Sequence, residues 1–102
     1  MIDTAFISER IAQLRTEKNI SARDMSLSLG QSQSYINNIE NKKSLPSMEM
    51  FLYICEFLCV EPKEFFDEET PSPTKLNETF ELLKTLTPKQ LDLLISVAKE
   101  MN

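Results

Sequence analysis

The feature that most constrains this 102-residue sequence is its single glycine, Gly30. Gly30 follows a short segment that begins at the N-cap residue Ser21 and carries Met25 and Leu29 on one helical face. Because glycine readily adopts the left-handed conformation that ends a helix, Gly30 predicts that this helix stops and the chain reverses. A second N-cap residue, Ser32, follows only two residues later. The sequence therefore predicts two short helices joined by a tight turn.

The second of these helices is predicted to run from Ser32 to Asn41, with Ile36 and Ile39 on its inward face. Two short helices joined by a tight, glycine-containing turn are the geometric core of a helix-turn-helix. No part of the sequence sustains the alternation of apolar and polar residues that a half-buried strand requires. We therefore expect the protein to be all-α.

Three more helices are predicted around this pair. The first covers about residues 4–18 with Asp3 as its N-cap, and a short last one starts at Pro62, since proline is favoured at the first helical position. Between them, a helix from Met48 to Leu58 follows the cap residue Ser47 and is apolar on nearly all sides. Such a helix must be buried on more than one side, so we expect something beyond the small domain to cover it.

The chain is predicted to divide into a helical domain over residues 1–67, a linker over 68–73 and a helical hairpin over 74–102. The linker segment is charged and polar and contains prolines. The second helix of the hairpin starts at Thr87, the first residue of a capping box. A hairpin of this size is too small to fold well alone, so it must pack on the fourth helix or on a second copy of the chain.

The residues between Ile20 and Ser47 resemble the Xre/Cro/C1-type helix-turn-helix family of regulators, and the likeness covers about residues 5–67. Its most specific part is Ser-Gln-Ser-Tyr-Ile-Asn-Asn-Ile-Glu-Asn over residues 32–41, which falls at the family's spacing after Gly30. The resemblance implies a five-helix, lambda-repressor-like domain that binds double-stranded operator DNA as a dimer.

Short amide and hydroxyl side chains occupy the outward face of the helix predicted from Ser32. Amides both donate and accept hydrogen bonds, so they can read the edge of an adenine in the major groove. The resemblance places base reading chiefly on Gln33, Ser34 and Asn38, with Asn37 as the weaker candidate. The alternative is that these residues are ordinary solvated polar side chains.

Contacts to DNA phosphates are expected near the start of the second helix and in the loop after the third, where they would position the protein without reading sequence. The candidates are Arg10, Arg23, Asn41, Lys43 and Ser44, for each of which ordinary surface polarity is the alternative. The resemblance further implies a partly buried ion pair between Arg15 and Glu40. This pair would lock the first helix to the recognition helix.

The sequence departs from the family pattern at three positions. Ala22 stands where the family often has a glutamine that reaches phosphate and braces the recognition helix. Lys42 replaces a common glycine after that helix, so we expect Asn41 to take the left-handed conformation instead. Cys59 replaces a frequent glycine at the end of the fourth helix.

The net charge of −5 argues mildly against a nucleic-acid partner. Residues 1–66 carry seven basic and nine acidic side chains, and residues 67–102 carry four basic and seven acidic ones. A locally basic face matters more than the net charge, and several of the basic residues lie at or near the predicted motif. DNA therefore stays the expected partner.

The residue types present exclude several classes of function. The chain has no histidine, and its two cysteines, Cys55 and Cys59, are too few for a zinc site and spaced too far apart on a helix for a disulfide. We expect both to be buried apolar residues, with no metal, no cofactor and no catalytic residues. No run is apolar enough to cross a membrane, and the N-terminus lacks a signal peptide, so we expect a cytoplasmic protein.

The surplus apolar residues of the fourth helix and the tail predict an interface with a second copy or another protein. They are Met50, Tyr53, Phe57, Phe80, Leu83, Leu91, Leu94 and Ile95. The leading interpretation is a dimeric, sequence-specific transcription regulator that acts as a repressor. The alternative is a protein-interaction module, such as an antitoxin or adaptor that binds a toxin or antirepressor through the C-terminal hairpin.

Overall fold

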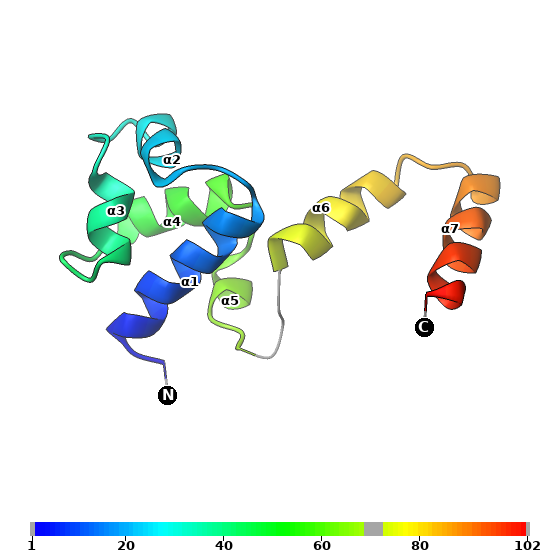
Figure 1. Ribbon diagram of the computed structural model, residues 1–102, viewed down its shortest axis with the longest axis horizontal. Coiled ribbons are helices and arrows are strands. Elements are labelled where there is room, and N and C mark those ends of the chain that lie inside the picture. Colours follow the sequence, from blue (N-terminus) through cyan, green and yellow to red (C-terminus); the bar gives the residue numbers. More distant parts are fainter. Residues whose placement is uncertain (1, 69–72, 102) are drawn as a thin grey trace.

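The computed structural model describes residues 2–68 and 73–101, and its regular elements are all helices. In chain order these are α1 (Thr4–Glu17), α2 (Ala22–Ser28), α3 (Tyr35–Glu40), α4 (Met48–Phe57), α5 (Pro62–Phe65), α6 (Pro73–Leu83) and α7 (Pro88–Glu100). Figure 1 shows α1 to α5 gathered in one cluster, with α6 beside it and α7 further out. The predicted all-α class and the helix-turn-helix arrangement are confirmed.

Local caps explain where the first, second and fourth helices begin. The side chain of Asp3 accepts a hydrogen bond from the Phe6 N–H at 3.0 Å, and Ser21 does the same for Asp24 at 3.0 Å. Ser47 accepts from the Met50 N–H at 3.1 Å. Each bond satisfies a backbone donor that the first turn of a helix leaves without a partner. These are the caps that the sequence indicates.

The third helix begins later than predicted, at Tyr35 rather than Ser32. Residues 32–34 instead form a turn, in which the Tyr35 N–H donates to the Ser32 carbonyl at 3.0 Å. The reason lies in α2. The buried Ser26 hydroxyl accepts from the Ile36 N–H at 2.9 Å and donates to the Ala22 carbonyl at 2.7 Å. A neighbouring helix thus supplies the cap that was expected from within the segment.

The core of the domain lies between all five helices from α1 to α5. Phe65 from α5 is fully buried and meets the Phe51 ring edge-to-face, with 5.0 Å between ring centroids. Burial of each large apolar side chain contributes on the order of 1.5–3 kcal/mol to folding. The buried apolar residues are Ile11, Leu14, Met25, Ile36, Ile39, Phe51, Ile54, Cys55, Leu58, Val60 and Phe65.

Three described residues other than glycine adopt left-handed backbone conformations. Lys42 itself has a φ of 64°, whereas Asn41 has a φ of −86°, so the expectation that Asn41 takes this conformation is wrong. Cys59 has a φ of 58° at the end of α4. Its side chain is exposed, which contradicts the expected burial of both cysteines, because the turn at this position directs it outward.

The first turns of α6 belong to the globular domain. The Thr74 hydroxyl is buried and donates to the Leu58 carbonyl at 2.6 Å, and the Asn77 amide donates to the Cys59 carbonyl at 2.9 Å. An ion pair of 3.0 Å joins Lys18 of α1 to Glu78. Pro73, expected at the end of the linker, is already the buried first residue of α6. Linker positions 69–72 lie outside the described residues.

The end of α6 and all of α7 keep their apolar side chains exposed. α7 has no buried residue, and Figure 1 shows it diverging from α6 rather than lying along it. The two expected tail helices are therefore present, with the capping box at Thr87 formed, but they leave their apolar faces uncovered within one chain. No helix in the described ranges is long and apolar enough to cross a membrane.

The left-handed conformation of Cys59 leads to a stability prediction. Cys59→Gly removes the steric cost of a Cβ at positive φ, so the free energy of unfolding should rise by roughly 1 kcal/mol. Cys59→Ala is the matched control, because it removes the thiol but keeps the Cβ. Urea denaturation monitored by circular dichroism measures both. Equal stability of the glycine and alanine variants would contradict the assignment.

Candidate nucleic-acid interface

The third helix is mounted on the domain by two isoleucines and one ion pair. Ile36 and Ile39 are both fully buried on the inner face of α3. The last residue of the helix, Glu40, receives a two-pronged bond from Arg15 of α1: Nε donates to Oε2 at 2.7 Å and Nη2 donates to Oε1 at 2.9 Å. Arg15 also donates from Nη1 to the Ile20 carbonyl at 2.9 Å. The expected ion pair that links α1 to α3 is therefore present.

The environment of this ion pair is mostly buried. The side chains of Arg15 and Glu40 are only 19% and 12% exposed. The hydrogen bond to Glu40 is the main cause that raises the pKa of Arg15, and it outweighs the opposing effect of burial. A planar guanidinium that meets a carboxylate with two parallel bonds also fixes orientation, so the pair sets the direction in which α3 points.

The polar side chains predicted to read bases lie on the surface opposite these anchors. Gln33 and Ser34 are exposed in the turn that precedes α3, and Asn37 is exposed on the helix itself. Asn38 is half-buried, so its side chain reaches solvent less than that of Asn37. In Figure 1, α3 and its flanking turns lie at the opposite end of the molecule from α7. The tail of the same chain therefore leaves this surface open.

Four of the five residues predicted to contact phosphate are exposed near α3, and the fifth, Arg10, is buried elsewhere. Arg23 is exposed in the first turn of α2, and Asn41, Lys43 and Ser44 are exposed in the loop after α3. These four side chains flank the polar surface at both ends.

Lys42, a neighbouring loop residue, is not among the predicted DNA contacts. Its ammonium lies 3.4 Å from the Glu9 carboxylate in a highly exposed ion pair.

Arg10 does not belong to this surface. It is only 5% exposed, and its guanidinium points to the end of α5, where Nε donates to the Phe65 carbonyl at 2.9 Å. Nη2 donates to the carbonyls of Glu64 and Asp67 at 3.0 and 3.2 Å. A guanidinium held by several carbonyls at a helix end neutralises their partial negative charge and cannot reach a phosphate. The predicted phosphate contact by Arg10 is therefore wrong, and its role is structural.

One contact within the surface was not foreseen from the sequence. Arg23 donates from Nε to the Gln33 Oε1 at 3.1 Å, so a residue expected at phosphate and one expected at a base are joined. Ser26, which caps α3 from α2, was also missed. A serine four residues before the glycine of the turn is the sequence signal that could have indicated the cap.

Charge is distributed unevenly along the chain. Residues 21–47, which include α2, α3 and their loops, carry three basic and two acidic side chains. Residues 48–102 carry five basic and eleven acidic ones. Since Glu40 of the first group is paired with Arg15, the α2–α3 surface is the part of the molecule that repels phosphate least.

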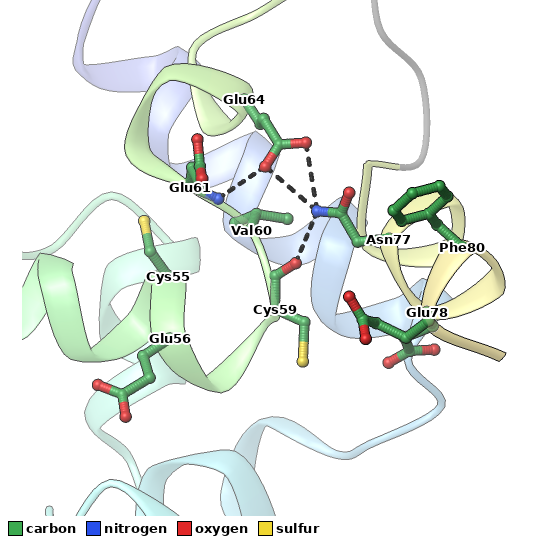
Figure 2. Close-up of a pocket in the computed structure, with 10 residues that line it drawn as sticks. Cys55, Glu56, Cys59, Val60, Glu61, Glu64, Asn77, Glu78 and Phe80 are labelled. Atoms are coloured by element: carbon green, nitrogen blue, oxygen red, sulfur yellow. Dashed lines mark hydrogen bonds between the residues drawn. The ribbon is translucent and has the colours of Figure 1, made fainter. Parts of the chain in front are cut away.

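An acidic groove of about 630 Å³ lies elsewhere, between the end of α4, α5 and α6. Figure 2 shows Asn77 within it, donating to both oxygens of Glu64 and to the Cys59 carbonyl. The other acidic side chains that line it are Glu56, Glu61, Glu78 and Glu81. This wall repels DNA, so the groove is a poor place for a nucleic acid.

The two thiols differ in environment. Cys55 is buried, and burial raises its pKa to about 11, so it stays protonated at neutral pH. Cys59 is exposed at the groove. Among residues 2–68 and 73–101, no group of three or more cysteine, histidine or carboxylate side chains is arranged to hold a metal ion.

Comparison with known families agrees with this geometry. A family model described as a helix-turn-helix domain matches residues 8–71, a segment that includes α2, α3, α4 and α5 and most of α1. The match covers well over half of the chain and is consistent with the resemblance to Xre-type regulators. No curated protein and no solved structure matches the chain significantly.

The buried ion pair leads to a prediction about stability. Glu40→Ala leaves the Arg15 guanidinium partly buried without its main partner, so the free energy of unfolding should fall by roughly 2–3 kcal/mol. The matched control is Glu9→Ala, which removes the exposed partner of Lys42 and should cost at most about 0.5 kcal/mol. Urea denaturation compares them. Similar losses in both variants would show that the pair does not hold α3.

Proposed function

Because this chain belongs to the helix-turn-helix domain family, we propose that it is a sequence-specific DNA-binding regulator that reads operator DNA with α3 and the turn before it. The observation that carries the proposal is that one face of this segment is buried and the other is exposed. Ile36 and Ile39 are fully buried, while Gln33, Ser34 and Asn37 remain exposed on the other side. Amide and hydroxyl groups are suited to base edges in the major groove, which admits a helix. We assign base reading to these three exposed residues and to Asn38.

The backbone of the DNA would be held at both ends of this surface. We assign phosphate contacts to Arg23 at the start of α2, and to Asn41, Lys43 and Ser44 in the loop after α3, all of which are exposed. Such contacts fix the register of the protein on the duplex. Few cations face the DNA in one subunit, so two subunits acting together would strengthen the complex.

We propose that the protein acts as a homodimer assembled through its C-terminal helices. α7 is a 13-residue helix with a capping box and no buried residue. Helices of this length are marginal in water unless an apolar face packs against something. Leu94, Ile95 and Phe80 remain 43%, 53% and 59% exposed, so a second copy offers them an equivalent apolar partner. A dimer would place two recognition helices about 34 Å apart, on successive turns of the major groove.

Repression is the action that these properties favour. A small dimer that occupies an operator excludes other proteins from the same DNA. We also propose a cytoplasmic location, in which such a regulator would have access to its operator.

A second candidate is a protein-interaction module such as an antitoxin or adaptor. The observations that favour it are the acidic excess of residues 48–102 and the exposed apolar side chains of α6 and α7. A basic toxin or antirepressor would complement that half of the molecule. The two candidates differ in one property: only the DNA-binding regulator binds duplex DNA with an affinity that falls steeply as salt rises.

Removal of the base-reading side chains tests the first proposal. On a duplex selected from a random library by the wild-type protein, Gln33→Ala or Asn38→Ala should weaken binding by about 1–3 kcal/mol. Gel shifts at several salt concentrations give both the affinity and the salt slope. Lys99→Ala is the control, because it removes a cation from α7, far from α3. Unchanged binding by both alanine variants would remove the assignment of readers.

Disruption of the α7 stripe tests the dimer. Ile95→Asp places a charge in the proposed interface, so the protein should sediment as a monomer, and its circular dichroism should lose at most the helical signal of α7. The matched control Ser96→Asp adds the same charge on another side of α7 and should leave the dimer intact. Analytical ultracentrifugation at tens of micromolar compares them with the wild type. A monomeric wild-type protein at that concentration would contradict the proposal.

A further inference from the structure

The hydrogen bond between Arg23 and Gln33 fixes the orientation of the Gln33 side-chain amide. Arg23 Nε–H is a donor, so at 3.1 Å it can only meet the carbonyl oxygen of the Gln33 amide. The two amide N–H groups of Gln33 are therefore on the side of the amide away from Arg23. Both side chains are exposed, and no other described residue hydrogen-bonds either of them. An unrestrained glutamine would have no such preferred orientation.

Resting on the function proposed above, we propose that Arg23 is a positioning residue that makes Gln33 a hydrogen-bond donor to guanine. A free glutamine reads adenine by donating to N7 and accepting from the N6 amino group. Here the accepting oxygen is already bonded to a cation, which weakens it as an acceptor for N6. The groups of Arg23 and Gln33 that remain available are N–H donors. Guanine is the base whose major-groove edge offers two acceptors, N7 and O6, and no donor.

The guanidinium of Arg23 can also contact a DNA phosphate. Its Nε bonds Gln33, and its two terminal nitrogens make no hydrogen bond within the described ranges, which leaves them free for a phosphate. Arg23 would thus tie the reading side chain to the DNA backbone.

The bond matters more in the complex than in the free protein. Between exposed side chains in water, a hydrogen bond contributes little because water competes for both partners. A docked duplex excludes that water and lowers the local dielectric, which strengthens the bond. The preference for guanine should therefore depend on Arg23 even though the fold does not.

The test is selection of bound sequences from a randomised duplex library by the full-length protein. The position read by Gln33 is the one whose preference disappears in Gln33→Ala, and the wild type should prefer guanine there. Arg23→Ala should reduce that preference by about tenfold and weaken overall binding. Arg23→Lys should restore overall binding and its salt slope, because the charge returns, without restoring the preference for guanine, because a lysine lacks the planar fork.

Two further variants separate positioning from charge. Gln33→Glu presents only acceptors, so the preferred base at that position should change from guanine to cytosine, whose N4 amino group is a donor. Lys43→Ala should weaken binding to all sequences alike and leave every base preference unchanged. Circular dichroism checks that each variant is folded.

The outcomes distinguish the two levels of the proposal. A selected consensus that keeps its guanine preference in Arg23→Ala overturns the positioning role while leaving the DNA-binding function intact. A wild-type preference for adenine at the Gln33 position also overturns it. If the wild type selects no sequence and shows no salt-dependent binding, the proposed function itself fails.

Discussion

The paired bonds between Arg15 and Glu40 hold the helix on which the proposed recognition surface depends. α3 has only six residues, and a helix that short has no stability of its own in water. Its position is set instead by Ile36 and Ile39 beneath it and by the carboxylate of Glu40 at its end, which α1 grips. Because a guanidinium and a carboxylate meet in one plane, the grip fixes rotation as well as position. The polar turn before α3 is continuous with the helix, so its orientation depends on that of α3. The Arg15–Glu40 pair therefore determines which side chains face outward.

The two arginines of α1 show how the chain distributes its few positive charges. Arg10 holds the carbonyls at the end of α5, and Arg15 holds α3, so both serve the fold rather than a ligand. Few cations are left for DNA, and those that are exposed lie on α2 and in the loop after α3. The acidic residues lie mainly beyond residue 48, many of them around the groove beside α6. A molecule with a negative net charge can therefore still keep one surface that repels phosphate less than the rest of the molecule does.

The features that depend on local sequence were predictable, and those that depend on tertiary contacts were not. The helix starts at Asp3, Ser21 and Ser47 follow from caps that act within one turn, and the buried isoleucines follow from helical spacing. The start of α3 differs from the predicted one because Ser26, on a different helix, accepts a hydrogen bond from the Ile36 N–H in its first turn. The predicted phosphate contact of Arg10 is wrong because nothing near it in sequence reveals that α5 packs against its side chain. The Arg15–Glu40 ion pair was predictable only from the family resemblance, because the helical spacing of apolar residues says nothing about which charges meet across the fold. The docking of α6, and with it the acidic groove, rests on contacts between residues that are far apart in sequence.

The central claim is that DNA meets this protein at the turn before α3, at α3 itself and at the loop after it. Amide chemical shifts of isotope-labelled protein, followed by nuclear magnetic resonance during titration with a bound duplex, test this claim residue by residue. The account predicts that the largest changes fall within residues 31–44 and at the start of α2, with little change around the groove lined by α6. Changes confined to α6 and α7, or an α3 region whose shifts stay constant while the duplex binds, would contradict it.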